Sequence, residues 1–132
     1  MVRWLTEQGF SVFITSWKNP TPDMANVSFD DYLRDGVDEA VKFVCKLHKV
    51  PKVALAAYCI GGTLVSTYMA WANRHYGADK VPVTCWTLFT TLTDFSKPGD
   101  IEVFIDEDTV RSLEASMAKK GCLEGSEMAA SF

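Results

Sequence analysis

The sequence predicts an α/β fold in which parallel strands are joined by crossover helices. Short β-branched or apolar runs alternate with stretches of helical spacing, and the connections between them are short. In addition, 48% of the 132 residues are hydrophobic and 23% are charged, as in an ordinary folded domain. Strands that alternate with helices over short loops form parallel sheets, because each helix carries the chain back across the sheet. The length allows one domain at most.

A short helix and a strand are predicted at the start of the chain. Residues 2–8 have helical spacing and end at Gly9, and residues 11–17 (SVFITSW) form a β-branched and aromatic run. Two prolines, at positions 20 and 22, then stop the strand. We therefore expect the first strand of the sheet over residues 11–17.

An amphipathic helix is predicted from Phe29 to His48. Ser28 is its expected N-cap, and Asp31 follows three residues later as a short-armed version of the capping box. The apolar side chains that recur at three- and four-residue steps are Phe29, Leu33, Val37, Ala40, Val41, Val44 and Leu47. The opposite face, which we interpret as solvated, carries Asp30, Arg34, Asp38, Lys42 and Lys46.

Two more strands flank a second helix. Residues 52–58 (KVALAAY) form a continuous apolar run, which is typical of a strand covered on both faces. Residues 63–76 return to helical spacing and end at Gly77, and residues 81–91 (VPVTCWTLFTT) form the next strand. The order of strand, helix, strand, helix and strand predicts a parallel sheet.

The character of the sequence changes after Thr93. A turn-forming stretch at residues 96–100 is followed by a charged, helix-prone stretch that Gly121 and Gly125 interrupt. We therefore place a subdomain boundary near Asp94, with residues 1–93 as the core and residues 94–132 as a separate part.

Charge and cysteine content argue against several classes of function. The formal net charge is −4 and no stripe of Lys and Arg is present, so we expect no nucleic-acid partner. The four cysteines are widely spaced and only two histidines occur, which predicts neither a metal site nor a disulfide framework. Reduced thiols and the lack of an apolar leader at the N-terminus favour a cytoplasmic location.

One uncharged stretch, residues 53–72, is about as long as a membrane-spanning helix. Gly61 and Gly62 interrupt it, and the residues before them have strand character while those after them have helical spacing. We interpret the stretch as a buried strand, turn and helix, and expect no transmembrane span.

The turn within this stretch is the predicted site of the chemistry. Residues 57–62 (AYCIGG) match the pattern small-x-nucleophile-x-glycine at a strand-to-helix junction, which is typical of a nucleophile elbow. An elbow is a sharp, strained turn, so the residues two before and two after its centre need small side chains. Cys59 is therefore the candidate nucleophile. The residues expected to form the elbow and its pocket are Ala57, Tyr58, Gly61 and Gly62.

The helix that follows Cys59 favours the thiolate over the thiol, because its N-terminal amides point at the sulfur. The amide of Ile60 is the predicted oxyanion-hole donor, since the residue after the nucleophile supplies it in this geometry. A free cysteine after an apolar strand is also commonly a buried core residue, and the spacing alone leaves this alternative open. Cys45, Cys85 and Cys122 have no comparable setting, and we interpret them as structural.

The two histidines are not predicted to be the catalytic base. His48 and His75 each end a helix, and the helices of a parallel sheet end at the edge opposite the elbow. Their expected role is interaction with the dipole of their helix. Asp94 follows the last predicted strand at the correct edge, but a turn or capping role is expected for it.

Taken together, these segments resemble the polyhydroxyalkanoate synthases, a family of acyltransferases with an α/β-hydrolase fold and a cysteine in an elbow similar to GYCIGG. The resemblance runs nearly end to end, although Ala57 stands where the family has glycine. The segments that carry it are residues 2–5, 8–9, 16–20, 30–32, 58–63, 90–95, 98–100 and 103–106.

The resemblance implies polymerisation of (R)-3-hydroxyacyl-CoA. Cys59 would attack the thioester, CoA would leave, and a hydroxyl group of another acyl unit would then attack the enzyme-bound acyl group. Tyr58 and Ile60 would flank the pocket, and residues 94–132 would begin the cap. No cofactor is implied, because CoA belongs to the substrate. The expected partners are the acyl-CoA, the growing polyester and further copies of the intact enzyme at the surface of cytoplasmic polymer granules.

The resemblance also implies that the chain is an internal fragment of an α/β-hydrolase fold. The catalytic aspartate and histidine of the family are expected beyond Phe132, and one strand of the sheet before residue 1, so we expect no synthase turnover from this chain alone. Two alternatives remain: a cysteine hydrolase similar to dienelactone hydrolase, and a non-catalytic truncated α/β-hydrolase module. Residues 94–132 favour the synthase, because that kind of hydrolase has no counterpart of the cap.

Overall fold

The structure is a computed structural model and describes residues 1–104, 106–123 and 125. Its helices are α1 (Val2–Glu7), α2 (Phe29–Asp31), α3 (Glu39–His48), α4 (Ile60–Tyr76) and α5 (Glu107–Lys120), and its strands are β1 (Val53–Tyr58) and β2 (Val83–Phe89). A π-helical segment, Tyr32–Asp38, joins α2 to α3, and 3-10 turns occupy Pro22–Met24, Ala78–Lys80 and Gly99–Phe104.

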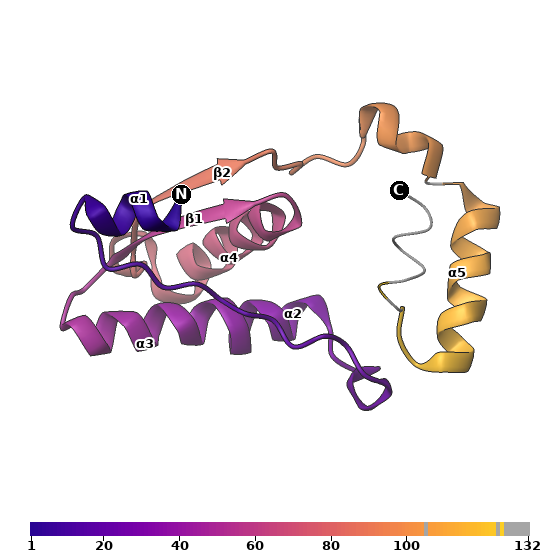
Figure 1. The fold of residues 1–132 in the computed structure, drawn as a ribbon, viewed down its shortest axis with the longest axis horizontal. Coiled ribbons are helices and arrows are strands. Elements are labelled where there is room, and N and C mark those ends of the chain that lie inside the picture. The colour runs from indigo at the N-terminus through magenta and orange to yellow at the C-terminus, as the bar shows by residue number, and fades with distance from the viewer. Residues whose placement is uncertain (105, 124, 126–132) are drawn as a thin grey trace.

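Helix α4 and a helical rod made of residues 29–48 (α2, the π-helical segment and α3) both lie below the two strands in Figure 1. The rod contacts α4 through its π-helical segment and β1 through α3. Tyr68 and Ala72 on α4 are completely buried. The buried cluster comprises Leu33, Val41, Leu64, Tyr68, Ala72, Val81 and Val83.

The predicted parallel sheet is confirmed for two of its three strands. β1 and β2 are parallel and are joined by α4, with Tyr58 opposite Phe89 at their carboxyl ends. The prediction that the first of these strands is covered on both faces is wrong for the described part of the chain, because α4 packs on one face only. Alternate residues of β1 are accordingly exposed.

The strand predicted over residues 11–17 is not formed, and this prediction is wrong. The segment has no ladder with β1 or β2 and runs along the helical rod (Figure 1). Its aromatic side chains explain this placement. The ring of Phe13 meets His48 edge-on at 5.3 Å, and that of Trp17 meets Tyr32 at 5.3 Å. The aromatic residues that suggested a buried strand pack against helices instead.

The predicted start of the amphipathic helix is confirmed. The Ser28 hydroxyl accepts a hydrogen bond from the Asp31 amide at 3.3 Å, and an Asp31 carboxylate oxygen accepts one from the Ser28 amide at 2.7 Å, which completes the capping box. Helical structure then continues to His48 as predicted, although Tyr32–Asp38 winds as a π-helix.

The assignment of Asp38 to the solvated face is wrong. Only 2% of this residue is exposed, although charged residues are rarely buried. A π-helix has more residues in each turn than the 3.6 of an α-helix, so the winding before Asp38 rotates it away from the face that regular spacing predicts. Arg34, which stays exposed, pairs with Asp31 at 3.3 Å.

Helix α4 ends as the sequence predicts, at Gly77, whose φ of 85° lies in a region that favours glycine. Helix α5 ends at Gly121 with φ 82°, also as predicted. Figure 1 shows α5 set apart from α4 and the two strands. Residues 105, 124 and 126–132 of the predicted cap lie outside the described residues. The subdomain boundary near Asp94 stays a prediction.

In the ranges that the structure describes, none of the helices combines the length and the apolar character that a membrane span needs.

Candidate active site

Cys59 is the single residue between β1 and α4. The strand ends at Tyr58 and the helix begins at Ile60, so the whole change of direction falls on the cysteine. Its backbone has φ 52° and ψ −125°. Its amide donates a hydrogen bond to the carbonyl oxygen of Phe89 at 2.9 Å, which extends the ladder between β1 and β2 up to the turn. The predicted sharp bend beneath Cys59 is therefore present.

The backbone of Cys59 is strained, because a residue with a Cβ atom rarely adopts a positive φ. Such conformations cost about 1–3 kcal/mol and are concentrated at functional sites. The Cys59 side chain is exposed, so the alternative role as a buried core cysteine does not apply in this structure. Tyr58 and Ile60, the neighbours expected to flank the pocket, are 70% and 63% exposed. Both neighbours therefore present apolar surface to the solvent next to Cys59 in the chain.

The first turn of α4 binds the backbone carbonyl of Cys59. The amides of Gly62 and Thr63 donate to the Cys59 carbonyl oxygen at 2.9 and 3.4 Å. Ile60 is the first residue of the helix, and the amide of a first residue has no carbonyl one turn earlier within the helix. The role of oxyanion-hole donor expected for the Ile60 amide stays a prediction.

The elbow glycines differ in what they contact. The sequence predicted that Gly61 is the one that must be small, but a Cβ atom built on Gly61 meets nothing within 4 Å in the described structure. A Cβ atom on Gly62 would overlap Oγ1 of Thr91 and lie 2.7 Å from its Cγ2 atom. The close approach is therefore one residue later than predicted, because the first turn of α4 presents Gly62, and not Gly61, to the chain that leaves β2.

The two histidines lie away from the elbow, as the sequence predicts. His75 is one residue from the end of α4, about 24 Å along the helix from Cys59 at a rise of about 1.5 Å per residue. Its ring stacks on Trp71 with centroids 4.5 Å apart. His48 ends α3 and meets the ring of Phe13. Neither is placed to accept a proton from the Cys59 thiol.

Asp94 has the turn role that was expected for it. One of its carboxylate oxygens accepts a hydrogen bond from the Ser96 amide at 2.9 Å. This bond and the Ser96 hydroxyl hold the pKa of the carboxyl group below its usual value. Asp94 thus stabilises its own turn.

The other cysteines have different surroundings from Cys59. The Cys45 sulfur lies 4.0 Å from the Pro82 carbonyl oxygen, and burial raises the pKa of its thiol. Cys85 is exposed but lies within β2, where the backbone is extended. Cys122 is half-buried. In the part of the chain that is described, no cluster of His, Cys, Asp and Glu side chains is grouped as a metal site requires.

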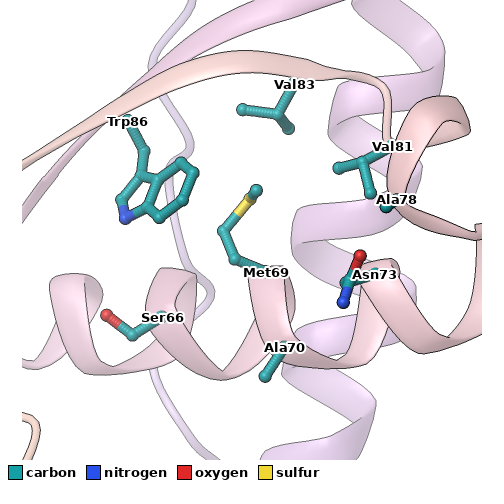
Figure 2. A pocket seen from close by; sticks show the side chains of 8 residues that line it. All are labelled: Ser66, Met69, Ala70, Asn73, Ala78, Val81, Val83 and Trp86. Carbon is teal, nitrogen blue, oxygen red and sulfur yellow. The ribbon is translucent and has the colours of Figure 1, made fainter.

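A separate apolar groove of about 460 Å³ lies between α4 and β2 (Figure 2). Met69 occupies its centre, between Trp86 and Val83 (Figure 2). The groove is lined by Ser66, Met69, Ala70, Asn73, Ala78, Val81, Val83 and Trp86. None of these side chains can accept a proton at neutral pH, and the nearest in sequence to Cys59 is about two helical turns away. The exposed cysteine is therefore the better candidate for the site of chemistry.

Comparison with known proteins connects the elbow to a family. The chain is 37% identical over 131 residues, 99% of its length, to the poly(3-hydroxyalkanoate) polymerase subunit PhaC of Rhizobium meliloti. It is 35% identical over 136 residues to the poly(3-hydroxyalkanoate) polymerase of Methylorubrum extorquens, and 35% identical over 137 residues to PhaC of Cupriavidus necator, in both cases over 100% of the chain. The chain is homologous to one segment of the poly(3-hydroxyalkanoate) polymerases. No protein-family model matches it.

The resemblance to polyhydroxyalkanoate synthases is confirmed by these polymerases. The matches reach from the first helix to the stretch after α5, so they include the elbow as well as the predicted cap. The chain spans 21%, 21% and 23% of the length of the three relatives. The hydrolase alternative is not favoured, since these relatives are named as polymerases.

Sequence reasoning missed a polar network in the interior of this polymerase homologue. Asp38 accepts hydrogen bonds from the Tyr68 hydroxyl at 3.1 Å and from the Tyr76 hydroxyl at 2.8 Å, and Lys42 lies 2.7 Å from its other oxygen. Burial raises the pKa of both tyrosines, and the hydrogen bond to Asp38 raises the pKa of Lys42. The network joins α4 to the helical rod. The network depends on the π-helical winding before Asp38, and the three- and four-residue spacing of apolar residues does not predict that winding.

Proposed function

We propose that Cys59 is the acyl-accepting nucleophile of a polyhydroxyalkanoate synthase. The observation that carries the proposal is the conformation of Cys59, a residue with positive φ and an exposed side chain between β1 and α4. Homology to polymerases along the whole chain supplies the kind of reaction.

The proposed reaction has two acyl transfers. In the first, the Cys59 thiolate attacks the thioester carbonyl of (R)-3-hydroxyacyl-CoA, the bond from the carbonyl carbon to the CoA sulfur breaks, and CoA leaves as a thiolate that takes up a proton. In the second, the hydroxyl oxygen of another acyl unit attacks the Cys59 thioester, loses its proton, forms an ester and releases the thiolate. One thiolate replaces another in the first step, so the reactants and products of that step have similar free energies.

The residues around Cys59 support both transfers. Each passes through a tetrahedral oxyanion, and the amide of Ile60 is proposed as one of the donors that stabilise it. Ala57 and Gly61 leave the turn uncrowded, and Tyr58 and Ile60 offer apolar surface to the acyl chain. CoA enters as part of the substrate, and no cofactor is part of the proposal.

The remaining parts of the proposal concern the intact enzyme. We place it in the cytoplasm at the surface of polymer granules, as a homo-oligomer that binds the acyl-CoA and the growing polyester. His48 and His75 lie at the wrong ends of their helices to act as the base, so we expect this chain alone to accept an acyl group slowly and not to polymerise.

The experiment is to incubate the chain with (R)-3-hydroxybutyryl-CoA and to measure free CoA and polymer. The expected result is the release of no more than one CoA for each chain, with no polymer, while Cys59→Ser releases none above background. Equal CoA release by Cys59→Ser and the unaltered chain would overturn the assignment of Cys59. Repeated turnover with polymer formation would contradict the expectation that the chain alone is inactive.

A further inference from the structure

The chain that leaves β2 holds the elbow from both sides. On the strand side, the Phe89 carbonyl oxygen accepts the hydrogen bond from the Cys59 amide at 2.9 Å. On the helix side, the Thr63 hydroxyl donates a hydrogen bond to the Leu92 carbonyl oxygen at 2.7 Å. Two backbone carbonyls only three residues apart therefore fix the bend residue, Cys59, and the first turn of the helix after it.

Thr91 fills the space between these two hydrogen bonds. Its side chain lies directly against Gly62, where a Cβ atom would be 2.7 and 2.8 Å from Cγ2 and Cβ of Thr91. Its hydroxyl donates to the Phe89 carbonyl oxygen at 3.1 Å, which fixes the rotamer. Gly62 is buried, so Thr91 and Gly62 are in close-packed contact, and a larger side chain at position 62 would have to displace protein atoms.

Thr90 makes this arrangement possible. It has φ 45°, a left-handed conformation that is strained for a β-branched residue. The change of direction at Thr90 lets Thr91 contact Gly62 while the carbonyl of Leu92 reaches Thr63. Two strained residues, Cys59 and Thr90, therefore follow the paired carboxyl ends of β1 and β2. Strain at both positions persists only where the surrounding contacts fix it.

We infer that Thr63 and Thr91 are positioning residues for the nucleophile. They do not touch the reacting atoms but fix the first turn of α4, and with it the Ile60 amide, relative to the sulfur. Acyl transfer depends steeply on such placement. The inference deepens the proposed function and rests on it as far as acyl transfer is concerned.

The test compares Thr63→Ala with Thr63→Ser and with Thr67→Ala. Serine keeps the hydroxyl group that binds Leu92. Thr67 is the matched control, because its hydroxyl donates at 2.9 Å to the Thr63 carbonyl oxygen within α4 and makes no such bond to the part of the chain after β2 that is described. Thr91→Ala tests the second contact. Circular dichroism of each variant establishes that the fold is retained.

Two readouts separate positioning from folding. The first is the rate of a single acyl transfer from (R)-3-hydroxybutyryl-CoA as a function of its concentration. The saturating rate is expected to fall about tenfold in Thr63→Ala, with the half-saturating concentration unchanged. The second is alkylation by iodoacetamide of Cys59 relative to Cys85 in the same sample, which is expected to fall about fivefold because the loosened turn no longer holds the sulfur outward. Thr63→Ser and Thr67→Ala are expected to behave as the unaltered chain does.

The two proposals fail in different ways. If the unaltered chain takes up the acyl group and Thr63→Ala retains both the saturating rate and the alkylation ratio, the positioning role is overturned and the proposed function stands. If the unaltered chain takes up no acyl group but Thr63→Ala lowers the alkylation ratio, the proposed function fails and the positioning role stands. An equal loss in Thr63→Ala and Thr63→Ser would also overturn the role of the hydroxyl group.

Discussion

Replacement of Gly62 by alanine is expected to destabilise the fold, whereas the same replacement at Gly61 is not. Both glycines lie in the first turn of α4, so the gain in helix propensity, at most about 1 kcal/mol for each, is nearly the same. The added methyl group meets nothing within 4 Å at Gly61 but overlaps Thr91 at Gly62. The difference between the two variants therefore isolates the cost of this one contact.

That cost follows from the packing. Inserting a methyl group into a well-packed site costs about 1–3 kcal/mol. The upper part of this range is expected, because Thr91 is fixed by its bond to Phe89 and the obstructing atoms include its Cβ, which cannot rotate away. Urea unfolding of the 132-residue chain, followed by circular dichroism, measures the difference in the free energy of unfolding between Gly61→Ala and Gly62→Ala.

A double variant completes this test. Thr91→Ala removes Oγ1 and Cγ2 but leaves Cβ, 2.8 Å from the new methyl group, so the combination with Gly62→Ala is expected to recover part of the loss. If Gly62→Ala is as stable as Gly61→Ala, the contact between α4 and the chain after β2 does not restrict this position and the reasoning is refuted.

Three further predictions concern the polar network and the strained turn. Asp38→Ala is expected to lower the free energy of unfolding in urea by about 2–4 kcal/mol, because it leaves the fully buried Tyr68 hydroxyl without an acceptor. The control, Asp35→Ala at an exposed position, is expected to change it by less than about 0.5 kcal/mol. Equal effects would contradict the role of the network. Burial raises the pKa of Tyr68, so as the pH rises above about 10 the unfolded chain loses the phenolic proton first and the folded state loses stability. The midpoint of urea unfolding is therefore expected to fall less steeply between pH 9 and 11 in Tyr68→Phe than in the unaltered chain. An unchanged slope would argue against a raised pKa at Tyr68. Thr90→Gly is expected to leave stability unchanged or raise it by up to about 2 kcal/mol, because glycine adopts a positive φ without strain. Thr87→Gly within β2 is expected to lower stability. A loss of stability in both variants would show that Thr90 is not strained.

The sequence predicts the elements whose signals are local. Ser28 and Asp31 specify the start of the helical rod, and Gly77 and Gly121 mark where α4 and α5 end. The elbow pattern around Cys59 predicts the bend, because few residue types tolerate a sharp turn between a strand and a helix. Each of these features depends on a few residues that are close in sequence.

The features that the sequence does not predict depend on contacts between distant residues. Residues 11–17 have strand composition, but a strand also needs a ladder partner, and Phe13 and Trp17 contact the helical rod instead. The burial of Asp38 depends on tyrosines 30 and 38 positions later. The demand for glycine at position 62 comes from Thr91, which only the pairing of β1 with β2 brings to the elbow.

The most direct test of the account is to locate the acyl group after a short incubation with (R)-3-hydroxybutyryl-CoA. Trypsin separates residues 53–74, whose one cysteine is Cys59, from residues 81–111, whose one cysteine is Cys85. Both thiols are exposed, but only Cys59 lies at a strained turn before a helix. Mass spectrometry is predicted to find the acyl group on residues 53–74 in about tenfold excess or more. Equal acylation of the two peptides would contradict the claim that the elbow makes Cys59 a nucleophile.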